Sequence, residues 1–463
     1  MDSVGQFIFA KKINGNFRGF ISFSSNSLSE PDYYYAGSYS GDIIIDDITI
    51  KGNYKSNIFI GKFNDKGNLI KYSILDGSGD DLLKDLLIAK TGNIYLTGSF
   101  ENDLRIEYDI LLSNGLSDAF IVQLDKELHL VDSKQIGGHY QDYGKNIKLD
   151  SRQNLVWTGC FSGDIQIANR QKLSSNGNLD VFICKYDIDG KLIWGDQFGG
   201  QGNDYLSSTE INEFNSIYFC GNFKSSIDKE NETLRSIGSL NDVFFVKYDS
   251  FGKFQYMESF GSHNSDFARK LVIDTANYMY LTGNFNSSFI AINDSTKNGN
   301  DLDFFITKLY DCSFGTAIDL PADTALCGSS YVILADTNFI DYTWNNISGG
   351  AEYEVDTTNL YELTVLDNKH CSSSDTIMVV LNTEPTVDLG SDQFVFKGEI
   401  IQLFAEQGMD SYQWNDNSYE SYLDINTIGL QEGTYTFSVI VTDTNFCNAR
   451  DEVNIAIIDL LNE

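Results

Sequence analysis

Short apolar runs separated by turn residues fill the first two-thirds of the chain. Within residues 205–261, four such runs are rich in Phe, Tyr, Ile and Val. They predict strands at 205–212, 216–223, 242–249 and 254–261. The second run is apolar throughout rather than alternating, which is typical of a strand covered on both faces. Because no long amphipathic helical pattern is evident, the chain is predicted to be all-β.

This pattern recurs at a fixed interval, which two markers reveal. One marker is a glycine followed two residues later by an aromatic residue, and the other is a polar residue two positions before a phenylalanine. The last four marker glycines are 61, 62 and 62 residues apart. The marker glycines are Gly37, Gly98, Gly159, Gly221 and Gly283, and the polar positions are Asn57, Asp118, Asp180, Asp242 and Asp303. Five four-stranded units repeated radially form a β-propeller, which is the fold that we expect.

The fifth unit is incomplete in sequence. It has an apolar third strand at 304–309 but no good fourth strand after it. We therefore expect residues 6–13 to supply the missing strand and to close the ring. If the chain is a fragment, the parent ring could hold more blades.

A second repeat, of about 70 residues, begins after residues 312–321. Alternating strands with a central Trp and a late Tyr-containing strand are typical of β-sandwich modules. The matching segments are 326–334 with 395–403, 341–344 with 411–414, and 361–371 with 435–447. We therefore predict a propeller at 1–316 and two immunoglobulin-like sandwiches at 317–382 and 383–463.

The composition narrows the possible partners and compartments. Of 463 residues, 32 are Lys or Arg and 66 are Asp or Glu, so the net charge is −34. Nucleic acids and anionic membranes bind basic surfaces, so neither is an expected partner. No apolar run approaches the ~18 residues that a membrane span needs. The N-terminus has no signal-peptide pattern, so the chain is cytoplasmic, has lost a leader, or is a fragment; the predicted domains favour the last two.

The repeats also resemble known families. The segments 94–100 (IYLTGSF), 182–190 (FICKYDIDG) and 194–200 (WGDQFGG) resemble the SBBP β-propeller repeats of bacterial surface and secreted proteins. That resemblance covers roughly residues 1–310. Residues 318–459 resemble the PKD or immunoglobulin-like modules of exported Bacteroidetes-type proteins. The resemblance implies a secreted or cell-surface protein but no activity, because the SBBP family is defined by its repeat and not by a catalytic site.

The cysteines suggest one disulfide. Cys327 begins an early predicted strand of the first sandwich and Cys371 follows a late one, so we expect a Cys327–Cys371 bond worth ~2–4 kcal/mol. Phe396 occupies the position of Cys327 in the second sandwich, which leaves Cys447 without a partner. The other cysteines have no metal-binding spacing and are expected to be buried free thiols: Cys160, Cys184, Cys220 and Cys312.

Residues 199–206 fit the calcium-binding nonapeptide of parallel β-helices, GGxGxDxUx. That motif needs tandem copies nine residues apart, whereas here it recurs after about 62 residues. One aspartate per repeat lies 17 residues before a marker glycine: Asp81, Asp142, Asp204 and Asp266. We expect these carboxylates to accept main-chain N–H bonds in turns, with a ring of acceptors at one face as the alternative. Calcium is the only cofactor left open, with Asp187, Asp189 and Asp204 as candidates.

No catalytic residue is predicted, and the leading hypothesis is a non-enzymatic adhesion or binding protein. A glycan or protein ligand would contact the variable stretches 101–117, 162–179, 224–241 and 286–302. One alternative is a polysaccharide-degrading hydrolase, which would need clustered carboxylates in the central funnel. Another is a passive stalk component, which exposed aromatic residues on one face would argue against.

Overall fold

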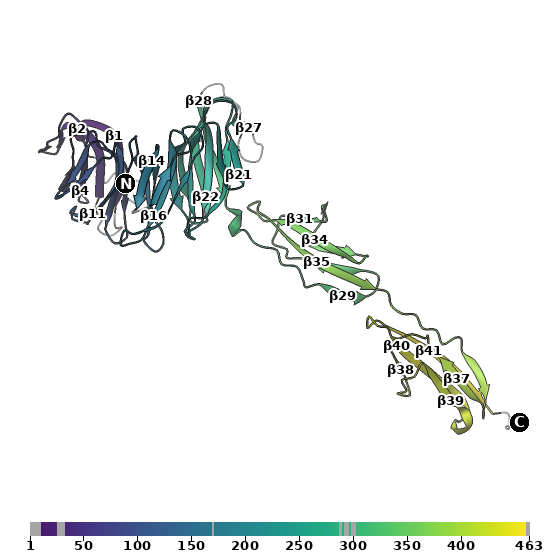
Figure 1. Cartoon of the computed structure of the whole chain (residues 1–463). Coiled ribbons are helices and arrows are strands. Elements are labelled where there is room, and N and C mark those ends of the chain that lie inside the picture. Colours follow the sequence, from purple (N-terminus) through teal and green to yellow (C-terminus); the bar gives the residue numbers. More distant parts are fainter. Residues whose placement is uncertain are drawn as a thin grey trace. The chain divides into compact units, whose positions relative to one another are not determined.

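The chain folds into two compact units, Met1–Tyr310 and Asp311–Glu463, which we call the five-sheet unit and the two-sandwich unit (Figure 1). The boundary lies six residues before the predicted one at 316. The part of the chain that the structure describes is all-β and contains no α-helix. The computed structural model describes residues 11–25, 33–168, 171–286, 289–290, 296–297 and 302–459.

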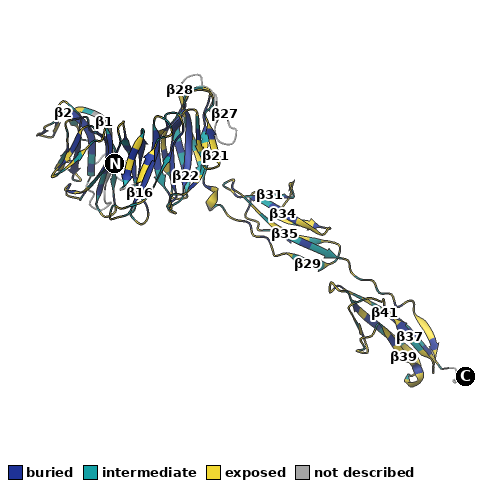
Figure 2. Ribbon diagram, in the orientation of Figure 1, coloured by how far each residue is buried: buried dark blue, intermediate teal, exposed yellow. Residues whose placement is uncertain are grey.

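The fourth repeat shows the construction of the five-sheet unit. Its strands β18 (Tyr205–Ile211), β19 (Ile217–Phe223), β22 (Asp242–Tyr248) and β23 (Phe254–Phe260) form one antiparallel sheet in that order. Every boundary lies within one residue of the predicted one, so the strand prediction is confirmed. All seven residues of β19 and of β22 are buried, and β22 has the buried colour along its length in Figure 2.

The other repeats form equivalent sheets. The first contains β1 (Ile13–Ser25), β2 (Tyr33–Ile45), β4 (Asn57–Phe63) and β5 (Leu69–Leu75), with β3 (Ile48–Ile50) paired to β2. The second contains β6 (Leu82–Ile88), β7 (Ile94–Phe100), β10 (Asp118–Leu124) and β11 (Leu130–Ile136). The third contains β12 (Tyr143–Leu149), β13 (Leu155–Phe161), β16 (Asp180–Tyr186) and β17 (Leu192–Phe198). The fifth contains β24 (Phe267–Ile273), β25 (Tyr278–Asn286) and β28 (Leu302–Tyr310).

The two sequence markers face each other across neighbouring strands. In the fourth sheet Gly221 is the cross-strand partner of Phe244, and a Cβ at Gly221 would overlap both that ring and the main-chain oxygen of Tyr205. The same pairing recurs as Gly37 with Phe59, Gly98 with Phe120, Gly159 with Phe182 and Gly283 with Phe305. At Gly159, Gly221 and Gly283 the absence of a side chain makes room for the paired ring, and there and at Gly98 it allows the main-chain oxygen of the sheet's first strand to approach closely.

Neighbouring sheets share apolar cores. One cluster joins Val181 and Ile183 of the third sheet to Phe219 and Phe244 of the fourth. Clusters of the same kind join the first sheet to the second, the second to the third, and the fourth to the fifth. Because each inner sheet is covered on both sides, its second and third strands are buried along nearly their whole length rather than on alternate residues.

A closed ring is not seen among the described residues. There, β28 pairs only with β25, and Ile13 pairs with Ile45 inside the first sheet. The strand proposed at 6–13 lies outside the described residues up to residue 10. Phe304 and Ile306 of β28 are 83% and 71% exposed, so this face of the fifth sheet lacks the cover that the inner sheets have.

The variable stretches contain short hairpins instead of open loops. In the described residues one face of each longer hairpin is packed against the core, as with Leu104, Ile165 and Ile227. The hairpins are β8 (Asp103–Ile106) with β9 (Asp109–Leu112), β14 (Asp164–Ala168) with β15 (Gln171–Ser174), β20 (Ser226–Lys229) with β21 (Glu232–Arg235), and β26 (Phe289–Ile290) with β27 (Thr296–Lys297). Isolated β-bridges join two of these hairpins to the preceding sheet. Arg105 of β8 pairs with Asp76, just after β5, and Gln166 of β14 pairs with Gly137, just after β11.

The two-sandwich unit contains two modules, and within its described residues, 311–459, no sheet crosses from one module to the other. The first has the sheet β29-β35-β34-β31-β32 and the pair β30-β33; the second has β36-β41-β40-β38 and the pair β37-β39. In the first module the strands are β29 (Thr324–Cys327), β30 (Tyr331–Leu334), β31 (Asp341–Trp344), β32 (Ile347–Ser348), β33 (Glu352–Val355), β34 (Asn359–Leu366) and β35 (Ser372–Asn382). In the second they are β36 (Gln393–Phe396), β37 (Ile400–Phe404), β38 (Ser411–Trp414), β39 (Tyr422–Asn426), β40 (Gly433–Thr442) and β41 (Asn448–Ile458).

The predicted correspondence between the two modules is seen in their hydrogen bonds. The buried indoles of Trp344 and Trp414 each donate to a main-chain oxygen six residues later, at 3.0 and 2.9 Å. The hydroxyls of Tyr361 and Tyr435 each donate to the oxygen four residues earlier, at 2.8 and 3.2 Å. Each Trp lies in a core that both sheets of its module share, so the modules are sandwiches.

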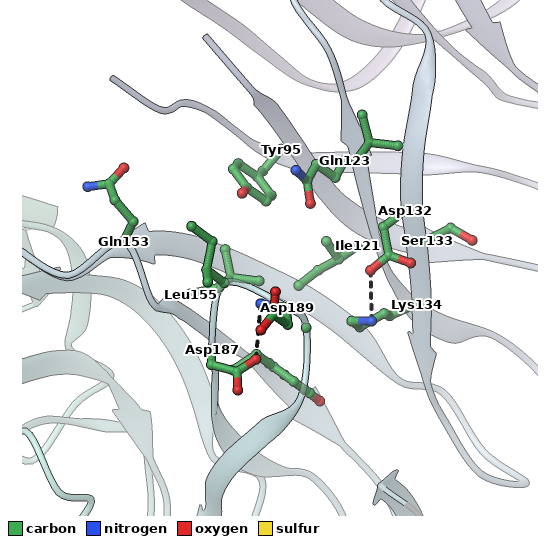
Figure 3. A pocket seen from close by; sticks show the side chains of 14 residues that line it. Tyr95, Ile121, Gln123, Asp132, Ser133, Lys134, Gln153, Leu155, Asp187 and Asp189 are labelled. Carbon is green, nitrogen blue, oxygen red and sulfur yellow. Dashed lines mark hydrogen bonds and ion pairs between the residues drawn. The ribbon is translucent and has the colours of Figure 1, made fainter. Parts of the chain in front are cut away.

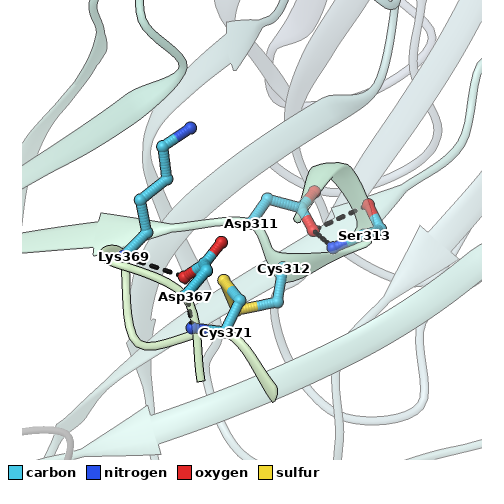
Figure 4. The surroundings of a disulfide bond; sticks show 6 residues. All are labelled: Asp311, Cys312, Ser313, Asp367, Lys369 and Cys371. Atoms are coloured by element: carbon cyan, nitrogen blue, oxygen red, sulfur yellow. Dashed lines mark hydrogen bonds between the residues drawn. A yellow bond between two sulfur atoms is a disulfide. The ribbon is translucent and has the colours of Figure 1, made fainter. Parts of the chain in front are cut away.

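The predicted Cys327–Cys371 disulfide is wrong. The bonds are Cys312–Cys371 and Cys327–Cys447, so Cys312 is not a free thiol and Cys447 has a partner. Cys371 ends a turn in which Asp367 accepts its main-chain N–H group at 2.9 Å (Figure 4). Cys447 ends the equivalent turn of the second module, where Asp443 accepts its N–H group at 2.8 Å. The turn of the first module is thus bonded to Cys312, which precedes that module and belongs to the two-sandwich unit. The turn of the second module is bonded to Cys327 at the end of β29, so this disulfide links the two modules. The prediction that Cys160, Cys184 and Cys220 are buried free thiols is confirmed.

Candidate binding surface

The hydrolase alternative would need carboxylates on the first strand of each sheet, the strand predicted to line the funnel. Among the described residues, β1, β6, β12, β18 and β24 carry only two carboxylates, Asp85 and Glu210. Asp85 accepts the main-chain N–H of Ile147 at 3.0 Å, and burial is the main cause of its raised pKa. Glu210 lies between two lysines, 2.8 Å from Lys148 and 3.5 Å from Lys270. Both carboxylates therefore interact with donors on the first strands of neighbouring sheets, β12 and β24.

The glycine-rich turns connect each sheet to the next. Asp142 accepts the N–H groups of Gly138 and Ser162 at 2.7 and 2.9 Å, and Asp204 accepts that of Gly200 at 2.7 Å. Asp266 accepts the N–H of Asn286 at 3.2 Å, so these three carboxylates have the predicted turn role. Asp81 differs, because both of its oxygens are buried without a hydrogen-bond partner. Burial, and then the neighbouring Asp103, raise the pKa of Asp81 to about 9.

An open pocket of about 560 Å³ lies beside the glycine-rich turn that leads into the third sheet. The variable stretches 101–117 and 162–179 form its other sides. Its lining includes Leu116, Tyr140, Ser162, Ser175 and Asn178. Leu116 and Tyr140 are 59% and 58% exposed. A volume of this size lies within the usual range for small-ligand sites.

Tyr140 is held against the turn at Gly163. A Cβ at Gly163 would approach the Tyr140 ring to 2.9 Å, and Gly163 has φ +70°, a backbone conformation that favours glycine. The ring therefore rests on a glycine that leaves its other surface open. A rigid tyrosine surrounded by Ser, Gly and Asn offers both apolar contact and adaptable hydrogen bonds.

Sequence reasoning identified the variable stretches but missed Tyr140. A signal was available, because the positions of Tyr140 in the other repeats are Gly79, Gly202 and Asn264. A large aromatic residue at a position otherwise occupied by small or polar residues has no role in the repeated fold. Comparison of the repeats position by position would therefore have selected it.

A smaller pocket, of about 220 Å³, borders the opposite turns of the second and third sheets (Figure 3). It contains the calcium candidates Asp187 and Asp189. Asp187 accepts the N–H groups of Asp189 and Lys191 at 3.1 and 2.8 Å, so it stabilises its own turn. Across the pocket, Lys134 pairs with Asp132 at 2.8 Å. The third candidate, Asp204, belongs to a different turn, so the three are not one site.

No family model matches the chain. Over 190 residues it is 23% identical to an uncharacterised WD repeat-containing protein of Acanthamoeba polyphaga mimivirus, a match that covers 35% of this chain and 14% of that protein. In the described residues no helix is long and apolar enough to cross a membrane.

Two solved structures illustrate the structural similarities. A protein of unknown function from Bacteroides caccae is 8% identical, with 68% of this chain and 90% of that chain covered and a TM-score of 0.29. The fibronectin(III)-like modules of Clostridium thermocellum CbhA are 13% identical, with 32% and 96% covered and a TM-score of 0.20. Such TM-scores carry no argument about fold or function, so the SBBP and PKD resemblances stay predictions.

Proposed function

We propose that the chain is a non-enzymatic extracellular binding protein. Its five-sheet unit would be a propeller-type scaffold of SBBP-like repeats, and its PKD- or immunoglobulin-like sandwiches would be spacers. The ligand, a glycan or a protein surface, would bind at the glycine-rich end of the second and third sheets. The observation that carries the proposal is the exposed Tyr140 ring, supported on Gly163 and bordered by Ser162, Ser175 and Asn178.

Three further observations support this proposal. The relative with WD repeats favours a propeller-type arrangement, because WD repeats form propeller blades. The two disulfides suit an oxidising, extracellular compartment. The inner carboxylates Asp85 and Glu210 are occupied by donors, which weighs against a hydrolase. The exposed aromatic ring weighs against a passive stalk.

Binding of the full chain to a broad glycan array tests the proposal. We expect selective binding that the substitution Tyr140→Ala weakens at least about tenfold, as removal of a central aromatic contact does. Phe251→Ala is the matched control, because Phe251 is 84% exposed in the β22–β23 turn, at the other end of the sheets. Equal loss in both variants, or no loss in either, would refute the assignment of the site. Absence of any glycan ligand would leave a protein surface as the ligand to be sought with the same variants.

A further inference from the structure

One position of the third strands differs in the second sheet alone. It lies five residues after the polar marker of each repeat. The second sheet has a glutamine at this position, whereas the other four sheets have a lysine. The residues are Gln123 in the second sheet and Lys62, Lys185, Lys247 and Lys308 in the others. The contacts that an ammonium group makes in the other sheets are therefore missing from the second.

Two of these lysines reach the turn that follows the third strand of the next sheet. Nζ of Lys62 donates to the main-chain oxygen of Lys126 at 3.2 Å and to the carboxylate of Glu127 at 3.4 Å. Nζ of Lys185 donates to the main-chain oxygen of Ser250 at 3.1 Å. Lys126 and Ser250 are both the second residue after the third strand of their sheet. The lysine of one sheet thus stabilises the same turn position of the next.

The equivalent acceptor positions between the second and third sheets line the smaller pocket. Ile188 and Asp189 follow Lys126 and Glu127 by 62 residues. Both line the pocket of about 220 Å³ together with Gln123, and Figure 3 labels Gln123 and Asp189. A glutamine side chain is shorter than that of lysine and carries no charge. This junction therefore keeps the acceptor residues of the turn and lacks the ammonium group.

A second difference between the repeats explains the free volume. Where the third sheet meets the fourth, the indole of Trp194 stacks on Tyr248, with ring centroids 6.4 Å apart and an interplanar angle of 8°. A Cβ at Gly252 would approach the same indole to 2.4 Å. The residue 62 positions before Trp194 is Asp132, which also lines the pocket. The pocket is thus the space that smaller side chains, Asp132 and Gln123, leave between two sheets.

The charge of the lining favours a cation. Three carboxylates line the pocket, those of Asp132, Asp187 and Asp189, against one cationic side chain, Lys134. Lys134 pairs with Asp132 at 2.8 Å, and among the described residues it forms no ion pair with Asp189. The net charge of −34 adds a long-range attraction for cationic ligands.

We propose that this pocket binds an alkylammonium group, either the lysine side chain of a partner protein or a free polyamine. The ligand would supply the contact that Lys62 makes in the first sheet, by donating to the main-chain oxygen of Ile188 and to the carboxylate of Asp189. Hydrogen bonds between an ammonium and a carboxylate are among the stronger ones in proteins. The alkyl chain would lie against Ile121 and Leu155, which line the pocket.

Saturation-transfer NMR on the full chain with Nα-acetyl-lysine methylamide tests the proposal. We expect a dissociation constant on the order of 1 mM. The same compound acetylated at Nε has no charge and should bind at least about tenfold more weakly. A parallel titration with 1,5-diaminopentane distinguishes the two sources of the ammonium. Tighter binding of the lysine derivative supports a protein partner, and tighter binding of the diamine supports a free polyamine.

Three variants locate the binding site. Gln123→Lys should abolish binding without lowering the melting temperature, because the new ammonium group would occupy the acceptors as Lys62 does in the first sheet. Asp189→Asn should weaken binding roughly tenfold. Glu127→Gln is the matched control, since Glu127 holds the same position one repeat earlier and already contacts Lys62. It should leave binding unchanged.

Two outcomes would overturn the proposal. One is equal binding of the charged and the Nε-acetylated compounds. The other is binding that persists in folded Gln123→Lys. If Gln123→Lys does not fold, the position cannot hold a lysine as the other sheets do, which would also contradict the assignment. Tyr140→Ala, which alters the other pocket, should leave binding of the lysine derivative unchanged, so this proposal and the proposed function can fail separately.

Discussion

The five-sheet unit and the two-sandwich unit bury their strands in different ways. In the five-sheet unit, strands such as β13, β16, β19 and β22 are buried along their whole length. In the two-sandwich unit, strands such as β34 and β41 alternate between exposed and buried residues. Sheets stacked on both sides share a continuous core, whereas each sandwich has only the core between its own sheets.

The two units also differ in the state of their cysteines. The buried cysteines of the five-sheet unit are free, and the four cysteines of the two-sandwich unit form two disulfides. Small domains bury a smaller share of their surface and often need covalent links. The difference indicates that noncovalent packing stabilises the first unit, whereas packing and disulfides together stabilise the second.

The largest expected effect comes from removing a shared aromatic residue. Phe244 is fully buried in the core that joins the third and fourth sheets, and it contacts Phe198 and Phe219. Phe244→Ala should lower the free energy of unfolding of the five-sheet unit by about 3–5 kcal/mol. The change is measured by denaturant unfolding, with the two-sandwich transition unchanged. Phe251→Ala, at an exposed position, should change it by less than about 0.5 kcal/mol; similar losses in the two variants would contradict the packing argument.

Loss of the disulfides should destabilise the two-sandwich unit and leave the five-sheet unit unchanged. The Cys312–Cys371 bond spans 59 residues, so its loss in the variant Cys312→Ser/Cys371→Ser should cost the two-sandwich unit about 2–5 kcal/mol. A reducing agent should lower the melting temperature of that unit alone, because Cys160, Cys184 and Cys220 are already free. A five-sheet unit that melts earlier under reduction would disprove this division.

The smallest expected effect concerns Asp81, the one turn aspartate with no partner for either oxygen. Its folded-state pKa is raised to about 9, above its value in the unfolded chain, so the folded state binds more protons between about pH 4 and pH 9. Stability from this group is therefore complete below pH 4 and is lost as the pH rises.

Asp81→Asn should accordingly increase the free energy of unfolding by about 1–3 kcal/mol at pH 8 and change it little at pH 4. Denaturant unfolding at the two pH values measures the difference. Asp142→Asn provides the contrast, since both oxygens of Asp142 accept hydrogen bonds and no gain is expected. An equal gain at both pH values would show that ionisation of Asp81 is not the cause.

The repeated sheets could be predicted from the order of residues alone. The Gly221 and Phe244 markers are cross-strand partners, and the same pairing joins the two markers in every other repeat, which explains why they recur together. Apolar runs also specified which strands have two covered faces, and Trp344 and Trp414 marked the equivalent cores of the sandwiches. These are local or periodic constraints, and they can be read from one sequence.

The contacts that join one repeat to another could be found only from the folded structure. Cys327 and Cys447 are 120 residues apart, and no spacing rule connects them. The packing of Tyr140 on Gly163 depends on the turn at that end of the third sheet. The side-chain amides of Asn114 and Asn176 occupy equivalent positions, yet the first donates to Asp118 and the second to the main-chain oxygen of Gly199. Such contacts arise from how the sheets are packed together, and the repeat pattern does not encode that packing.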